Sequence, residues 1–190
     1  MAITKKTGKK SFYEVKAPLT STKIHLYSLD QESLEGKKIK LDLTKSLRGK
    51  NLELKLKIRS SGKDLVAEAE STELLNSYIR RAMRKGTSYC EDSFEAECRD
   101  NVVRVKPLLI TRRRVSKAVL KALRENAKKY LEAYIKTRTA QEIFAEIISN
   151  RVQKQLSLKL KKIYPLTLCE IRIFKIIKPK AEIKEEKNDK

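Results

Sequence analysis

The fold of this chain is decided by residues 52–69, which read LELKLKIRSSGKDLVAEA. Leucine or isoleucine fills every second position of residues 52–58, and charged residues fill the positions between, which is the period of a strand with one buried face. A second alternating run, residues 65–69, follows the polar turn SSGKD at residues 60–64. Two such runs joined by a short turn predict an antiparallel hairpin.

Further strands and helices are expected on both sides of this hairpin. A period of two also marks residues 39–43, 88–99, 102–110 and 166–179, whereas a helical period marks residues 72–85, 115–136 and a segment that starts at Thr139 and stops before Pro165. Gly86 is expected to end the first of these helices, and Thr139 and Glu142 have the spacing of a capping box. Because Pro107 cannot donate a ladder hydrogen bond, its strand is expected to be an edge strand or to be interrupted there.

The order of these elements indicates the α+β class, with an antiparallel or mixed sheet, flanking helices and a long C-terminal helical pair. Only Thr137 and Arg138 separate the two long helices, so we expect a helical hairpin or one interrupted helix. The last strand, residues 166–179, is expected to join the earlier sheet, because a strand that returns after two helices usually does so.

Charge is the strongest functional signal in the chain. It carries 45 Lys and Arg against 24 Asp and Glu, a formal net charge of +21 over 190 residues. Such a chain repels itself, and nucleic-acid phosphates are its best partner because neutralising them releases condensed counterions. An anionic membrane surface and plain solubility are the competing explanations. Hydrophobic residues still make up 40% of the chain, so a real core is expected.

We therefore predict a basic N-terminal tail at residues 1–11, a single α+β RNA-binding domain at 12–180 and a charged, flexible tail at 181–190. The strongest candidate site is Arg112-Arg113-Arg114, since three successive guanidinium groups cannot all form internal salt bridges. The expected RNA contacts are Lys5, Lys6, Lys9, Lys10, Lys16, Lys23, Arg80, Arg81, Arg84, Lys85, Arg112, Arg113, Arg114, Lys117 and Lys121. For each cluster the alternative is a solvated basic face. Aromatic residues are only 6% of the chain, which favours recognition of backbone and shape over base stacking.

Residues for catalysis are scarce. His25 is the single histidine and has no acid or nucleophile in an evident constellation, and Cys90, Cys98 and Cys169 are spaced unlike a zinc site and are expected to be buried thiols. There is no glycine-rich phosphate loop, no apolar stretch of membrane-spanning length and no secretion signal. The sequence thus predicts a cytoplasmic protein that is not an enzyme and has no cofactor or metal.

Several motifs follow one another along the chain: FYEVKAP at residues 12–18, LEGKK at 34–38, LTKSL at 43–47, IYPL at 163–166 and KPK at 178–180. In this order they resemble the small-subunit ribosomal proteins shared by archaea and eukaryotes, the S-three-A-e family. The resemblance covers about residues 11–180. Lys37 stands where the family usually has Arg, and Lys40 where an acid is common.

The resemblance implies a structural, non-catalytic protein of the small ribosomal subunit, bound to the ribosome in the cytoplasm on the platform and messenger-exit side. It implies a strongly bent sheet or half-barrel with helices around it. The implied partners are small-subunit ribosomal RNA and neighbouring small-subunit proteins, with messenger RNA and initiation factors near the exit as further candidates, and no membrane. The absence of long extensions points to an archaeal-type member.

Two other functions are kept as alternatives. A free RNA-binding regulator of translation, or an RNA chaperone, would use the same basic clusters but would act transiently. Copy number separates the two, because a ribosomal protein is present at about one copy per subunit. An RNA-modifying enzyme would need a cofactor pocket, for which the sequence carries no motif.

Overall fold

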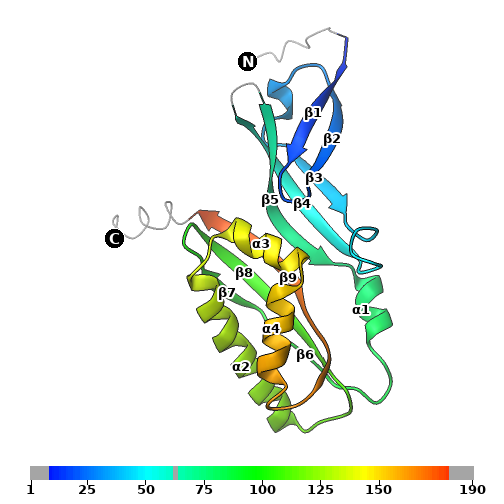
Figure 1. The fold of residues 1–190 in the computed structure, drawn as a ribbon, viewed down its shortest axis with the longest axis vertical. Helices are drawn as coiled ribbons and strands as arrows, with labels where there is room; N and C mark the ends of the chain where they lie inside the picture. Colours follow the sequence, from blue (N-terminus) through cyan, green and yellow to red (C-terminus); the bar gives the residue numbers. More distant parts are fainter. Residues whose placement is uncertain (1–8, 62–63, 180–190) are drawn as a thin grey trace, which may run out of the picture. The chain divides into compact units, whose positions relative to one another are not determined.

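The structure, a computed structural model, describes residues 9–61 and 64–179 (Figure 1). The predicted C-terminal tail and most of the predicted N-terminal tail lie outside these residues. The chain forms two compact units. The first is built from the residues up to Leu41 and from Lys55–Glu70, and the second from Asp42–Leu54 and from Ser71 onward.

The hairpin predicted from residues 52–69 is present as β4 (Leu52–Ser61) and β5 (Asp64–Leu74), which are hydrogen-bonded neighbours. Leu52, Leu54, Leu56 and Ile58 are all fully buried, so the alternation identified the core face correctly. β3 (Lys38–Asp42) pairs with β4, and β1 (Ser11–Ala17) pairs in parallel with β5 and antiparallel with β2 (Thr22–Ser28). A short 3-10 helix, η1 (Glu32–Leu34), follows β2.

The helix expected over residues 72–85 is wrong in its extent. β5 continues to Leu74, because residues 71–73 pair with β9 (Leu166–Pro179) from the far end of the chain. Helix α1 (Asn76–Ala82) begins only after Leu75, whose backbone N–H donates to the carbonyl of Asn51 at 3.0 Å. Strand pairing with a remote segment therefore overrides the local helical period.

The sheet of the second unit is interrupted at Pro107. The strand expected over residues 88–99 is two short strands, β6 (Tyr89–Glu91) and β7 (Phe94–Glu97), which both pair with β8 (Asn101–Thr111). Pro107 lies between the part of β8 that pairs with β7 and the part that pairs with β6, at a register shift against β9. β8 is thus not an edge strand, and the proline occupies the gap where it need not donate to β6 or β7.

Two long C-terminal helices were predicted, and the structure has three helices in this region. α2 (Lys117–Lys136) follows the prediction, with Ser116 as its N-cap. The predicted capping box is present: the Thr139 hydroxyl accepts from the Glu142 N–H at 3.4 Å, and the Glu142 carboxylate accepts from the Thr139 N–H at 3.0 Å. The helix that starts there is broken into α3 (Ala140–Ile148) and α4 (Arg151–Leu160) at Asn150, which has a left-handed φ of 58°. Asparagine tolerates this conformation better than most residues.

Together the described strands form one mixed sheet in the order β2-β1-β5-β9-β8-β6, with β3, β4 and β7 attached through β4 and β8. Within residues 9–61 and 64–179, β2 and β6 do not pair with each other, so the sheet is not closed into a barrel. The α+β class, the mixed sheet and the return of β9 to it are confirmed.

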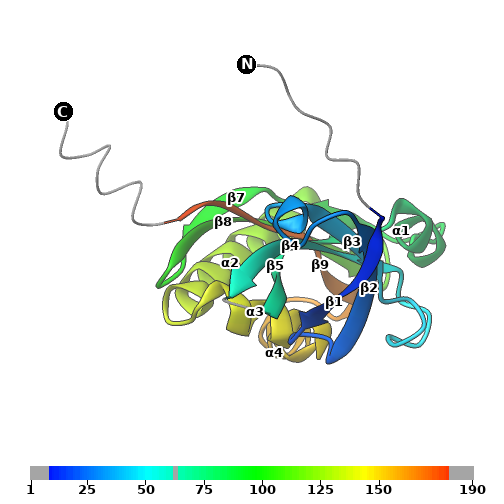
Figure 2. The same cartoon turned by 90° about the horizontal axis from the view of Figure 1, so that it is seen from above.

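Helices α2, α3 and α4 lie along one side of the sheet of the second unit. α2 contacts β6 and β7, while α3 and α4 contact β9 (Figure 1 and Figure 2). Leu108 and Ile110 pack against Ile79 of α1, whereas Cys90, the partner of Leu109 in the ladder, donates to the carbonyl of Leu120 in α2 at 3.8 Å. The last residues of β8 are therefore buried on both faces, and they fix the start of the segment that follows.

Candidate nucleic-acid interface

Two loops of the second unit are hydrogen-bonded to each other where β8 ends and β6 begins. The backbone N–H of Thr111 donates to the Ser88 carbonyl at 2.9 Å, and the Thr111 hydroxyl accepts from the Ser88 N–H at 3.1 Å. The Ser88 hydroxyl accepts from the N–H of Val115 at 3.3 Å. These bonds hold residues 83–88 beside residues 112–116.

This pairing joins two of the predicted basic clusters. Arg84 and Lys85 lie in the first loop, Arg112, Arg113 and Arg114 lie in the second, and Lys117 begins α2. We call these six residues the basic junction. All six are exposed, and neither loop contains a carboxylate. Gly86, with a φ of 84°, gives the first loop the left-handed turn that brings the chain back to β6.

The cations of the basic junction have no internal partners in the described part of the chain. No carboxylate of residues 9–61 and 64–179 lies within ion-pair distance of their side chains, and none of those side chains donates a hydrogen bond there. Exposed guanidinium and ammonium groups without carboxylate partners can donate directly to phosphate oxygens. Among the described residues, the three arginines therefore remain available to an external anion, and their contact with RNA stays a prediction.

The position of the basic junction at the N-terminus of α2 is unfavourable for the isolated protein. A helix N-terminus carries partial positive charge, so each cation placed there costs about 0.3–1 kcal/mol, and an anion is favoured instead. Helix stability therefore does not explain why Arg112, Arg113, Arg114 and Lys117 are placed at this end. A bound polyanion removes the cost, since it neutralises the cations and the helix terminus together.

Lys161 and Lys162 were missed by the sequence reasoning and belong to the same end of the sheet. They lie in the turn between α4 and β9, and Leu166, the first residue of β9, pairs with Thr111. From Arg151 to Lys162 the chain carries five cations and no acid. The absence of acids in residues 151–162 could have indicated a basic surface from the sequence alone. Only the pairing of β8 with β9 shows that this stretch ends beside Thr111.

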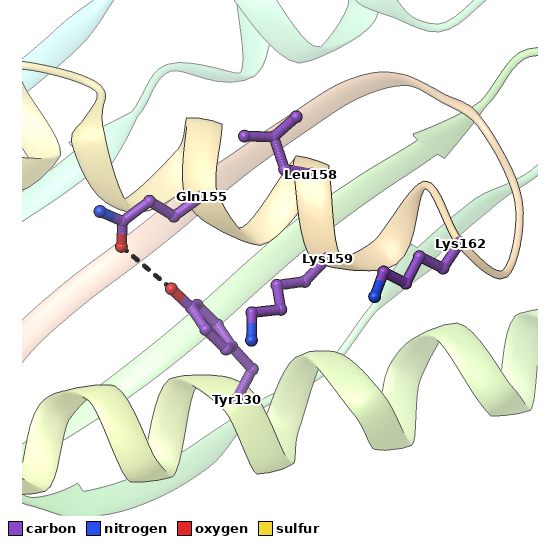
Figure 3. A pocket seen from close by; sticks show the side chains of 5 residues that line it. All are labelled: Tyr130, Gln155, Leu158, Lys159 and Lys162. Carbon is purple, nitrogen blue, oxygen red and sulfur yellow. Dashed lines mark hydrogen bonds between the residues drawn. The ribbon is translucent and has the colours of Figure 1, made fainter.

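A shallow groove of about 340 Å³ runs between α2 and α4 (Figure 3). The Tyr130 hydroxyl donates to the side-chain carbonyl of Gln155 at 3.0 Å, and Lys159 lies with its Nζ 5.7 Å from the centre of the Tyr130 ring. Leu158 and Lys162 complete the lining. Lys159 of α4 and Lys162, just after its end, therefore place two cations at this groove.

The other predicted contacts in the second unit are in different environments. Arg81 is held structurally, since its guanidinium donates to the side chain of Asn51 and to the carbonyl of Gly49 and lies over the Tyr78 ring. Arg80, on α1, is exposed. Lys121, one turn into α2, is 4.0 Å from Glu125. The expected cluster of Arg80, Arg81, Arg84 and Lys85 is thus divided, because α1 ends at Ala82 and the last two residues belong to the loop.

In the first unit the predicted lysines lie on or next to the β1–β2 pair. Lys16 forms an ion pair with Asp64 and Lys23 with Glu14, each at 2.8 Å. Lys9 and Lys10 are exposed just before β1. The remaining two predictions, Lys5 and Lys6, lie outside the described residues.

The described part of the chain contains no grouping typical of a metal site. Across residues 9–61 and 64–179, no three His, Cys, Asp or Glu side chains are placed to hold a metal ion. His25 is exposed on β2, opposite Glu14. Cys90, Cys98 and Cys169 are buried and form no disulfide, as predicted. None of the described helices combines the length and apolar character needed to cross a bilayer.

Comparison with known proteins gives consistent matches along the chain. The model of the Ribosomal S3Ae family matches residues 2–180. A protein of Nanoarchaeum equitans named small ribosomal subunit protein eS1 is 28% identical over 174 residues, which cover 87% of this chain and 88% of that protein. A protein of the same name from Desulfurococcus amylolyticus is 28% identical over 88% of this chain and 83% of that protein. Another, from Pyrobaculum aerophilum, is 31% identical over 72% of this chain and 63% of that protein.

Proposed function

We propose, because this chain belongs to the Ribosomal S3Ae family, that it is a structural component of the small ribosomal subunit and binds the RNA of that subunit through the basic junction. The archaeal relatives named small ribosomal subunit protein eS1 support the assignment to this subunit. The observation that supports RNA binding is the set of exposed cations at the basic junction, which have no carboxylate partner among the described residues.

The mechanism of RNA binding is electrostatic, and it depends on where the cations of the basic junction are held rather than on any reaction that they carry out. Thr111, Ser88 and Ser116 fix the two loops and the start of α2, so the backbone that carries the cations is ordered before RNA arrives. Arginine donates to phosphate in a fork with little further loss of conformational freedom, and each neutralised phosphate releases counterions. The protein thus acts as a non-catalytic clamp on folded RNA.

The expected setting is the platform and messenger-exit side of the subunit, in the cytoplasm. There the protein would contact small-subunit ribosomal RNA and neighbouring ribosomal proteins, with messenger RNA and initiation factors nearby. The lysines along α4 support more than one RNA or protein contact on the second unit. In this role the protein needs no cofactor and no metal.

Sucrose-gradient sedimentation of native cell extract tests this function. We expect the protein to sediment with small subunits, at about one copy per subunit by quantitative mass spectrometry against known subunit proteins. Recovery only from the unassembled pool would disprove the proposal. Recovery on subunits at far below one copy would favour the transient regulator instead.

A further inference from the structure

Two aromatic side chains of the first unit lie together on the surface. Phe12 is 72% exposed and Tyr27 is 59% exposed. They face each other across the β1–β2 ladder, with ring centroids 5.0 Å apart and planes at 43°. We call Phe12 and Tyr27 the exposed aromatic pair. Single exposed apolar residues are common, but two adjacent aromatic rings of this exposure indicate a contact surface.

The exposed aromatic pair belongs to a continuous face of the ribbon. Residues directly opposite one another in an antiparallel pair point to the same side. The ladder therefore places Phe12 with Tyr27, Glu14 with His25, and Lys16 with Lys23 on one side, and all six are exposed. The other side carries Val15 and Ala17, which are buried. The ribbon thus turns one face to the core and presents the aromatic face outward.

Lysines lie at both ends of this face, Lys9 and Lys10 next to the exposed aromatic pair and Lys16 and Lys23 at the other end. Lys10 lies with its Nζ 5.7 Å from the centre of the Tyr27 ring, and among the described residues neither Lys9 nor Lys10 has a carboxylate within ion-pair distance. Lys16 and Lys23 have carboxylate partners, but these ion pairs are exposed, and exposed pairs contribute little to stability. A phosphate group can replace either partner at small cost.

We propose that the exposed aromatic pair stacks unpaired bases of RNA, while Lys9, Lys10 and the lysines of the ribbon contact the adjoining phosphates. Aromatic faces accept any base, and a basic surround directs the phosphate backbone to them. This inference rests on the proposed function and extends it, because it names a single-stranded segment as a second ligand. The low aromatic content favoured shape recognition alone; the strand register shows that two of the few aromatic residues are side by side.

Charge favours RNA over a protein as the occupant. Lys9, Lys10, Lys16 and Lys23 outnumber the carboxylates of Glu14 and Asp64 on and beside this face, so its net charge is positive and complementary to a nucleotide segment. β2 also stands at one end of the strand order, where a strand of a partner protein could pair. That mode uses backbone groups at the edge and does not require aromatic rings, which makes it separable by substitution.

The test uses the full chain and fluorescence anisotropy with a labelled oligouridylate of about twelve nucleotides, a length within the usual site size for single strands. A duplex RNA of the same length is the second probe. We expect Phe12→Ala and Tyr27→Ala each to weaken binding of the single strand about 5- to 150-fold, as for the loss of one stacked base. Tyr27→Phe, which keeps the ring, should bind as the wild type does.

Base stacking also predicts how the affinity of the variants depends on salt concentration. Because no charge is removed, Phe12→Ala should shift the affinity at every salt concentration and leave the slope of log K against log salt unchanged. The inference is wrong if both alanine variants bind the oligouridylate within twofold of wild type. It is also wrong if Phe12→Leu retains full binding, since a plain apolar contact would then suffice and a protein partner would be favoured.

The outcomes separate this inference from the function on which it rests. If the alanine variants bind the oligouridylate as well as wild type, and the protein still sediments with small subunits, the stacking site is disproved but the structural role is not. If the wild-type protein is absent from small subunits, the proposed function is disproved. The single strand bound by the aromatic pair would then not come from the ribosome. Circular dichroism of each variant confirms folding, which these exposed positions should not disturb.

Discussion

Cys169 shows how its neighbours change the chemistry of a single residue. Its thiol is buried beside Glu170, and burial, followed by the nearby carboxylate, raises the pKa of this thiol from 9.0 to about 12. The sequence predicted a buried thiol, and the structure confirms it. A thiol with so high a pKa stays protonated at neutral pH and is a poor nucleophile.

The shifted thiol predicts a stability effect at alkaline pH. In the unfolded chain Cys169 loses its proton near pH 9, whereas in the folded chain it does so near pH 12. Between these values the folded state holds the extra proton, so its contribution to stability is complete below about pH 9 and falls as pH rises. We expect the free energy of unfolding to fall up to about 1.4 kcal/mol more per pH unit in wild type than in Cys169→Ala.

Urea denaturation at several alkaline pH values measures this difference. Tyrosines and lysines titrate in the same range in both proteins, so only the difference between the two curves is informative. Parallel curves for wild type and Cys169→Ala would show that the thiol titrates alike in the folded and unfolded states.

At the scale of the elements, a buried polar cluster fixes the break between α3 and α4. Lys50, in the loop before β4, is 7% exposed, and its ammonium group donates to Glu170 of β9 at 2.6 Å and to the side chain of Asn150 at 2.7 Å. Gln153 of α4 donates to the Ile147 carbonyl at 3.0 Å. The left-handed Asn150 therefore turns its side chain onto a lysine from a distant loop, which the helical period could not predict.

Removal of the lysine should destabilise the fold strongly. Lys50→Met leaves the Glu170 carboxylate buried without its cation, and we expect a loss of about 3–5 kcal/mol in the free energy of unfolding. Lys50→Met combined with Glu170→Leu should recover most of that loss, because no charge is then left buried. Lys154→Met, on the exposed side of α4, is the matched control and should change stability by no more than about 0.5 kcal/mol. A loss below about 1 kcal/mol for Lys50→Met would mean that water reaches Glu170 in solution.

At the scale of the whole molecule, the net charge is +21, but the cations differ in whether a carboxylate lies beside them. Arg59 and Arg104 are held by Glu68 and Glu95 at 3.1 and 2.6 Å, while the basic junction has no such partners in the described part of the chain. Only cations that contact phosphates release counterions. Their number sets the salt dependence of binding rather than the total charge.

The salt dependence gives a quantitative test of the basic junction. Contact with about six to eight phosphates predicts a slope of log K against log salt of roughly −4 to −7. Arg112→Ala with Arg113→Ala should reduce its magnitude by about 1–2 and weaken binding to many RNAs alike. The matched control is Arg59→Ala with Arg104→Ala, which removes the same charge outside the basic junction and should leave the slope nearly unchanged. Equal slopes for the two double variants would show that Arg112 and Arg113 do not contact phosphates.

Local pattern alone determined much of this protein. The alternation at residues 52–58 gave the buried face of β4, the spacing of Thr139 and Glu142 gave the start of α3, and the apolar run at 166–179 gave β9. These features depend on neighbours a few residues away, and the sequence contains them in full. The excess of Lys and Arg likewise indicates a polyanion as the partner.

Tertiary structure decided what depends on distant partners. Pairing with β9 extended β5 into the expected helix, and Asn150, where α3 and α4 are separated, accepts a hydrogen bond from the distant Lys50. The Ser88–Thr111 bonds joined two basic loops, and the β1–β2 register set Phe12 beside Tyr27. The physical reason is the same in each case: strand pairing and buried polar contacts join residues far apart in the chain, and no local period records which segments will meet.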